Sequence, residues 1–116
     1  MKHAGQIALT MFPDTDLAKG KLRPVLLLRR ASLRYDDWLV CMISSQLWQA
    51  EPDLDVLIST SDHDFPDTGL KVSSIVRISR LTVVDGRLLL GTLGRMEPDR
   101  LALIRRRLAA WISANT

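Results

Sequence analysis

The side chains best suited to chemistry in this sequence are one cysteine, two histidines and a large set of arginines and lysines. Cys41 lies within an apolar run, residues 39–43, which favours a buried and unreactive thiol over a nucleophile. A single cysteine also excludes a disulfide within the chain. His3 and His63 are far apart and neither has a partner at metal-ligand spacing, so we expect no metal site and no cofactor.

The basic side chains are unevenly distributed. The chain has 16 Lys and Arg against 13 Asp and Glu, a formal net charge of +3. Basic residues concentrate in the stretches 19–34, 71–80 and 95–107, whereas acidic residues concentrate between 51 and 67. This pattern permits an anionic partner such as nucleic acid on one face, and it leaves another face for a different partner.

Length and composition indicate one globular domain spanning residues 1–116, because 47% of the residues are apolar and 25% are charged. No apolar run approaches the roughly 20 residues that a membrane-spanning helix needs. The first residues, Met1 to Gln6, contain neither the apolar segment nor the cleavage site of a secretory signal. We therefore expect a cytoplasmic protein that does not bind a membrane.

The elements that must position these side chains are mostly short strands. Alternating or continuous apolar runs, rich in β-branched residues, are separated by turn residues such as Pro13, Pro24 and the Asp36–Asp37 and Asp85–Gly86 pairs. Residues 62–69 are predicted to form a polar loop. The predicted strands cover residues 7–11, 25–28, 38–43, 54–59, 73–78, 81–84 and 87–93.

The last part of the chain changes to helical spacing. Leu101, Ile104, Leu108, Trp111 and Ile112 form one apolar stripe, which predicts a helix over residues 98–114 with Trp111 in the core. A proline at position 98 suits a first helical turn. The three arginines at 105–107 are expected on the solvated face. The predicted fold is mainly β with a C-terminal α-helix, in a small curled sheet or barrel.

Four stretches together resemble the MazF/PemK family of toxins. The first is the basic, Gly-containing loop, Arg-Pro pair and apolar strand of residues 19–28 (KGKLRPVLLL). The others are residues 5–7 (GQI), residues 41–46 (CMISSQ), and residues 69–81 (GLKVSSIVRISRL), and a Leu93–Gly94 pair before the helix also fits. The matches keep their order over nearly the whole chain.

This resemblance implies an SH3-like small barrel of the CcdB/MazF type, usually a homodimer, that acts as the toxin of a type II toxin–antitoxin system. Such toxins are sequence-selective endoribonucleases that cut single-stranded RNA without a metal. The implied partners are a cognate antitoxin with an acidic, partly disordered segment, RNA, and DNA only through the antitoxin. The implied catalytic residues are Arg23 and Ser44, and the implied substrate-binding residues are Lys21, Pro24, Ser45, Gln46 and Arg77.

The implied pair fits the chemistry of RNA cleavage by the ribose 2′-hydroxyl, whose transition state gathers negative charge around phosphorus. The guanidinium of Arg23 is permanently charged and donates paired hydrogen bonds to phosphate oxygens, but it is a poor general base. If residues 25–30 pair antiparallel with residues 39–43, Arg23 and Ser44 lie at the same end of the sheet. The general base is not identified; His63 is a candidate only by its ordinary pKa.

Several residues have two interpretations. Gln46 either contacts a base edge or caps a turn, and Arg77 either binds phosphate or lies at a dimer interface, with RNA slightly favoured. Trp48 either stacks on a base or docks the antitoxin.

The sequence also departs from the family pattern. Ser44 stands where Thr is frequent, and Gln6 stands where Asp is frequent. These departures bear on cleavage specificity, and they leave a second hypothesis open. In that hypothesis the chain is a non-catalytic toxin or interaction module on the same fold, which poisons a protein such as gyrase or binds nucleic acid together with its antitoxin.

Overall fold

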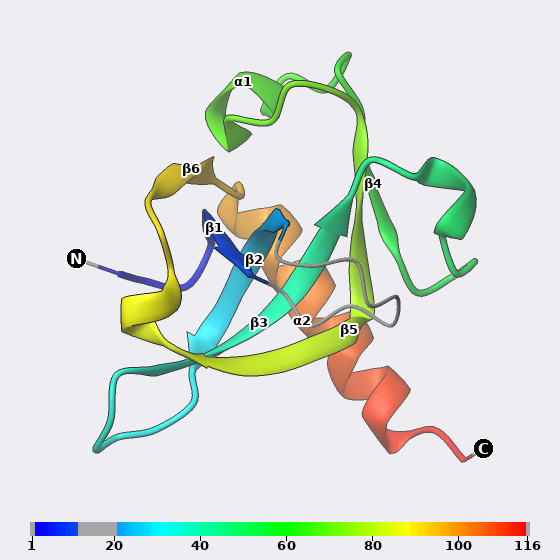
Figure 1. Ribbon diagram of the computed structural model, residues 1–116. Coiled ribbons are helices and arrows are strands. Elements are labelled where there is room, and N and C mark those ends of the chain that lie inside the picture. The colour runs from blue at the N-terminus through cyan, green and yellow to red at the C-terminus, as the bar shows by residue number, and fades with distance from the viewer. Residues whose placement is uncertain (1, 12–20, 116) are drawn as a thin grey trace.

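The frame of the molecule is a curled antiparallel sheet of six strands with a long helix against it (Figure 1). A computed structural model describes residues 2–115 except 12–20. The strand order is β4-β5-β3-β2-β1-β6. The sheet closes only part of a circle, as a half-barrel, and the predicted fold class is confirmed. The strands are β1 (Gln6–Met11), β2 (Leu22–Arg30), β3 (Asp37–Ser44), β4 (Val56–Ile58), β5 (Ser74–Asp85) and β6 (Thr92–Arg95).

Strand β5 carries much of the curl. The two predicted strands at 73–78 and 81–84 form one continuous strand. A bulge interrupts its pairing with β3 between Cys41 and Met42. Cys41 pairs with Leu81 and Met42 pairs with Arg77, so three residues of β5 have no partner between them. A bulge of this kind bends the strand and increases its twist.

Two predicted elements are wrong in detail. The strand predicted at 87–93 is replaced by a 3-10 helix, η2 (Gly86–Leu88), and by β6, which begins only at Thr92. The Asp85 side chain accepts a hydrogen bond from the Arg87 backbone N–H and so starts a turn where a strand was expected. The loop predicted at 62–69 contains a short helix, α1 (Phe65–Thr68), which ends at Gly69. The break predicted at 12–16 lies outside the described residues.

Apolar side chains fill both faces of the sheet. Alternate residues such as Leu26, Cys41 and Ile43 pack beneath the long helix, and their neighbours Val25, Leu27 and Val40 pack on the opposite face. Residues 25–28 are all fully buried, as expected for an apolar run covered on both sides.

The long helix, α2 (Pro98–Ser113), confirms the predicted helix. Ile104 and Leu108 are buried, but Trp111 is 45% exposed and Ile112 is 66% exposed, so the prediction that Trp111 lies in the core is wrong. Figure 1 shows the reason, because the C-terminal turns of α2 extend beyond the sheet.

The arginines of α2 also do more than face solvent. Arg105 donates to the carbonyl of Leu28, and Arg107 donates to the carbonyl of Asp55 at 3.0 Å. These bonds join the helix to the sheet. No helix among the described residues is long and apolar enough to cross a membrane.

Helix α1 lies directly on β6. Gly94 has no side chain that would hold β6 away from α1. A Cβ atom at this position would lie 2.2 Å from the carbonyl oxygen of Asp67. Gly69 has φ +71°, and its Cβ would lie 2.0 Å from the carbonyl oxygen of Leu93. Glycine is required at both positions, and this close approach forms one wall of the groove described next.

Candidate functional site

A groove of about 330 Å³ opens where β2 begins and β3 ends. Its charged and hydroxyl side chains are Arg23, Lys71, Ser44, Ser45 and Ser74, and the described residues that line it include no carboxylate. The remaining lining residues are apolar or glycine: Leu9, Leu22, Pro24, Ile43, Gly69, Leu70, Val72 and Leu93. The groove therefore presents two cations, whereas the hydroxyls of Ser44 and Ser74 are hydrogen-bonded within the protein.

The strand register places Arg23 and Ser44 on the same face of the sheet. The antiparallel β2–β3 ladder ends at the pair Val25–Met42, and Arg23 and Ser44 each lie two residues beyond that pair, toward the groove. Residues two positions beyond a paired couple project to the same side of the sheet as that couple, because side chains alternate along a strand. The sequence-based expectation that these two residues lie at one end of the sheet is thus met.

The Ser44 hydroxyl is held from two sides. It donates to Oε1 of Gln49 at 3.2 Å and accepts the backbone N–H of Gln46 at 3.0 Å. The residue is 7% exposed. Donation from Ser44 to a bound phosphate therefore requires exchange of its bond to Gln49.

Gln49 belongs to a buried polar network behind the groove. Its Oε1 also accepts a bond from Nη1 of Arg77 at 3.0 Å, and Nε of Arg77 lies 3.3 Å from Oδ2 of Asp55. Because Arg77 can only donate, the amide oxygen of Gln49 must face it. The side chain of Asp55 is fully buried and accepts hydrogen bonds from the backbone N–H groups of Glu51 and Ile78.

This network changes the expected role of Arg77. The side chain is 11% exposed and is directed at Asp55, and it does not line the groove. The geometry favours support of Gln49 and Ser44 over direct contact with phosphate. Sequence reasoning missed Gln49 and Asp55, since only the 3-10 turn η1 (Leu47–Gln49) and the start of β4 bring them to Ser44.

The other predicted binding residues divide into two groups. Pro24 and Ser45 line the groove, whereas Lys21 and Gln46 are exposed and do not. Gln46 stands at the N-cap of η1 without a side-chain capping bond, and its Oε1 accepts the indole N–H of Trp48 at 3.1 Å. The basic stretch 71–80 was noted in the sequence, but Lys71 was not singled out as a groove residue.

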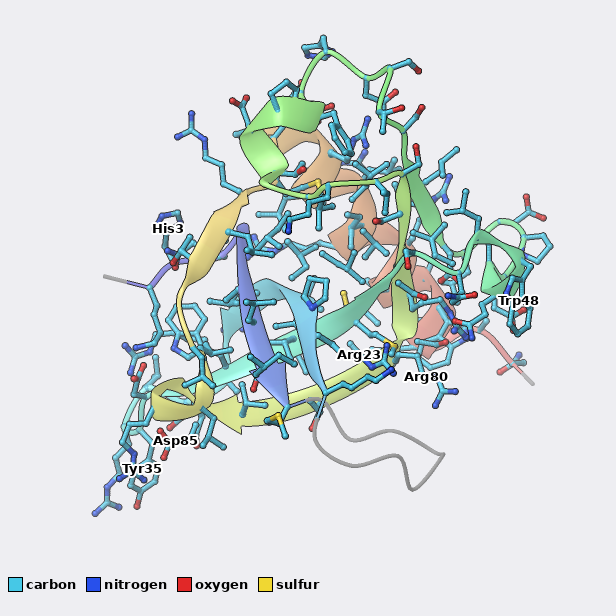
Figure 2. All side chains as sticks on the ribbon, turned by 45° about the horizontal axis from the view of Figure 1, so that its top comes forward. His3, Arg23, Tyr35, Trp48, Arg80 and Asp85 are labelled. Carbon is cyan, nitrogen blue, oxygen red and sulfur yellow. The ribbon has the colours of Figure 1, made fainter. Side chains whose placement is uncertain are left out.

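Trp48 and Arg80 extend the charged and aromatic surface beyond the groove. Trp48 is 79% exposed, and Figure 2 shows it projecting outward at one edge of the molecule. Arg80 lies in the bulge of β5, and in the same view it appears on the side to which the Arg23 side chain extends. An aromatic face and cations arranged in this way can hold a base and its phosphates.

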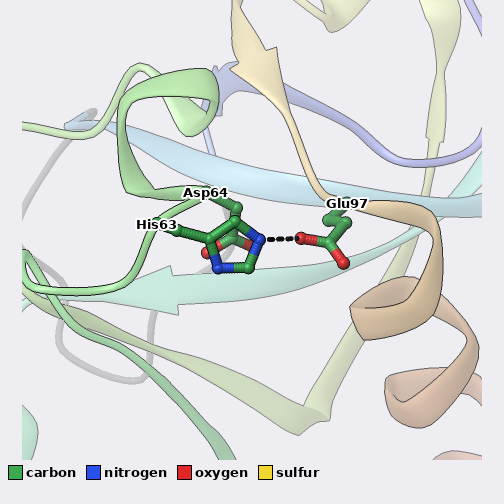
Figure 3. Close-up of side chains that lie close together, drawn as sticks. All are labelled: His63, Asp64 and Glu97. Carbon is green, nitrogen blue, oxygen red and sulfur yellow. Dashed lines mark ion pairs between the residues drawn. The ribbon is translucent and has the colours of Figure 1, made fainter.

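Cys41 and His63 lie outside the groove. Burial raises the pKa of the Cys41 thiol, which agrees with the predicted unreactive cysteine. His63 does not line the groove, so nothing supports it as the general base there. Its Nε2 instead lies 3.0 Å from Oε2 of Glu97, beside Asp64, in the one group of potential metal ligands found among the described residues (Figure 3).

Comparison with known proteins places the chain among toxins. A family model described as the PemK-like, MazF-like toxin of type II toxin–antitoxin systems matches residues 3–112. A comparison with curated proteins gives no match.

Three solved structures share the fold. An endoribonuclease in complex with its cognate antitoxin from a mycobacterial species has a TM-score of 0.70 at 17% identity, over 100% of this chain and 99% of that chain. The MazE–MazF complex (Form-II) from Deinococcus radiodurans has a TM-score of 0.70 at 20% identity, over 98% and 97%. The Mycobacterium tuberculosis toxin MazF-mt6 has a TM-score of 0.68 at 16% identity, over 96% and 99%.

Proposed function

The chain belongs to the family of PemK-like, MazF-like toxins of type II toxin–antitoxin systems, and we propose that it is a metal-independent, sequence-selective endoribonuclease that cuts single-stranded RNA. The observation that carries this proposal is the groove at the ends of β2 and β3. It combines Arg23 and Lys71 with the hydroxyl of Ser44 and has no carboxylate among its described lining residues. A phosphodiester is the ligand that this set of donors matches best.

The proposed reaction begins with attack of the ribose 2′-oxygen on the adjacent phosphorus. The new O2′–P bond forms a 2′,3′-cyclic phosphate as water takes up the 2′-hydroxyl proton, and the P–O5′ bond breaks as water protonates the leaving 5′-oxygen. Negative charge grows on the non-bridging oxygens during this step, and the guanidinium of Arg23 stabilises it. One donor aimed at developing charge contributes about 3 kcal/mol, or roughly 100-fold in rate.

Ser44 has a positioning role in this proposal, and Gln49 supports it. The hydroxyl lies across the ladder from Arg23 and is oriented by its bonds to Gln49 and to the Gln46 backbone. Exchange of the Gln49 bond lets Ser44 donate to the scissile phosphate. The proline after Arg23 restricts the backbone to an extended form and so limits where the guanidinium can reach.

The partners proposed for this chain follow from the same surface. A cognate antitoxin with an acidic segment would compete with RNA for Arg23 and Lys71, and DNA would bind only through that antitoxin. We place the protein in the cytoplasm, as a single toxin domain, and as a homodimer that size-exclusion chromatography with light scattering would detect.

One observation favours a second candidate, a non-catalytic toxin on this fold. The Ser44 hydroxyl is already bonded on both sides, as a purely structural serine would be. This candidate predicts growth arrest with intact RNA, and retained toxicity of the Arg23→Ala, Ser44→Ala double variant.

The deciding experiment incubates the purified chain with a long single-stranded RNA in excess EDTA and maps the product ends. Cleavage at a short recurrent sequence, with 2′,3′-cyclic phosphate ends, is expected. Arg23→Ala should reduce the rate at least 100-fold, while Arg106→Ala, an exposed arginine on α2, serves as the matched control. Wild-type cleavage by a correctly folded Arg23→Ala variant would overturn the mechanism.

A further inference from the structure

Three potential metal ligands meet where the chain enters α1 and α2. His63 and Asp64 precede α1, and Glu97 is the N-cap of α2. Their ligand atoms all lie within 4.8 Å of one another, and Nε2 of His63 is 3.0 Å from Oε2 of Glu97 (Figure 3). Because residues 64 and 97 are far apart in sequence, only the tertiary structure brings the segment before α1 beside the start of α2.

Asp64 is the unusual member. Its side chain is 4% exposed, and neither carboxylate oxygen receives a hydrogen bond from the described residues. Nη2 of Arg100 lies 3.4 Å from Oδ1, but the same nitrogen is closer to Asp62, at 2.9 Å. Burial of an ionised carboxylate without hydrogen bonds destabilises the fold, because its lost hydration is not replaced. A bound cation would supply the missing electrostatic interaction.

The donor set and the local charge define the class of cation. We propose that His63, Asp64 and Glu97 bind one divalent transition-metal ion of the zinc class. An imidazole nitrogen beside carboxylate oxygens favours Zn²⁺ or Co²⁺ over Mg²⁺ and Ca²⁺, which prefer oxygen ligands alone. The carboxylates of Asp62, Asp64 and Glu97 outnumber the single guanidinium of Arg100, so the site has a net negative charge.

The proposed ion site is open to solvent on one side and lies away from the groove. The His63 side chain is 86% exposed and that of Glu97 is 33% exposed, so an ion can enter from solvent and retain water as a further ligand. None of the three residues lines the groove of Arg23 and Ser44. The ion would join the segment before α1 to the start of α2 and stabilise the fold, without taking part in RNA cleavage.

The metal-free protein is titrated with ZnCl₂ in competition with a chromophoric chelator, which reports affinity and stoichiometry. Thermal unfolding is then recorded with and without Zn²⁺. One Zn²⁺ per chain is expected, with a Tm increase of about 10 °C once free zinc exceeds Kd about 100-fold. Bound Co²⁺ should show visible d–d absorption, and MgCl₂ should produce neither effect.

Variants separate this site from adventitious zinc. His63→Ala and the near-isosteric Glu97→Gln should each weaken Zn²⁺ binding by about 100-fold or more, since each removes a direct ligand. His3→Ala, which removes the other histidine of the chain, should bind like wild type. Equal binding by all four proteins, or no binding by the wild type, would overturn the proposal. Cleavage assays in EDTA are unaffected by either result, so the proposed nuclease function is tested separately.

Discussion

The buried pair of Arg77 and Asp55 allows the clearest quantitative test of how the candidate site is built. We consider Arg77→Met, which keeps much of the apolar stem of the side chain but removes the guanidinium and its charge. The carboxylate of Asp55, whose side chain is 0% exposed, would then retain only the backbone N–H groups of Glu51 and Ile78. Gln49 would lose the donor that fixes its amide oxygen toward Ser44.

The expected cost follows from the burial of both partners. Removal of one member of a buried ion pair typically destabilises a protein by about 3–5 kcal/mol, because the remaining charge is not compensated. The two backbone bonds to Asp55 persist, so the lower end of that range applies, and Arg77→Met should lower the free energy of unfolding by about 3 kcal/mol. For a chain of 116 residues, this corresponds to a Tm decrease of about 12 °C.

Urea denaturation followed by circular dichroism measures this loss. Arg80→Met is the matched control, because Arg80 lies on the same strand and makes no ion pair with the described residues. It should change stability by no more than about 0.5 kcal/mol. Equal effects of the two substitutions, or a loss below about 1 kcal/mol in Arg77→Met, would refute the buried network. Intact stability with abolished cleavage would instead identify Arg77 as an RNA contact.

Three more results are expected. Trp48→Ala should leave stability unchanged, since the side chain is 79% exposed, and should weaken RNA binding by about 10-fold through loss of base stacking; unchanged RNA affinity in a filter-binding assay would argue against stacking. Gly94→Ala should destabilise the fold by about 2 kcal/mol, measured by urea denaturation, because its Cβ would lie 2.2 Å from the Asp67 carbonyl oxygen, and a neutral effect would mean that α1 can shift off β6. The Arg87 side chain lowers the pKa of Asp85 from 3.8 to about 2, so the ionised carboxylate stabilises the fold above pH 4 and this contribution is lost as the pH falls toward 2. Asp85→Asn should therefore flatten the acid limb of a stability–pH curve recorded by chemical denaturation, and an unchanged slope would contradict the assignment.

Local patterns in the sequence determined the classes of element and most of their positions. The strands predicted at 25–28 and 38–43 and the helix predicted at 98–114 rest on short-range patterns, and the structure has β2, β3 and α2 at these places. The family resemblance singled out Arg23 and Ser44, and an antiparallel pairing of their strands was the condition for placing both at one end of the sheet; the structure has that pairing. The predicted strand at 87–93 was wrong. The Arg87 backbone N–H donates a hydrogen bond to the Asp85 side chain, and a 3-10 turn forms there in place of the first part of the strand.

The exposure of each side chain, and its partners distant in sequence, depended on the tertiary structure. Trp111 belongs to the apolar stripe of α2, yet it is 45% exposed because the helix extends past the sheet. Gln49 reaches Ser44 and Arg77 only through the fold of η1 and the bulge of β5, and His63 meets Glu97 only because α1 packs near the start of α2. Spacing along a chain encodes contacts a few residues apart, whereas these contacts depend on how separate elements are placed in space.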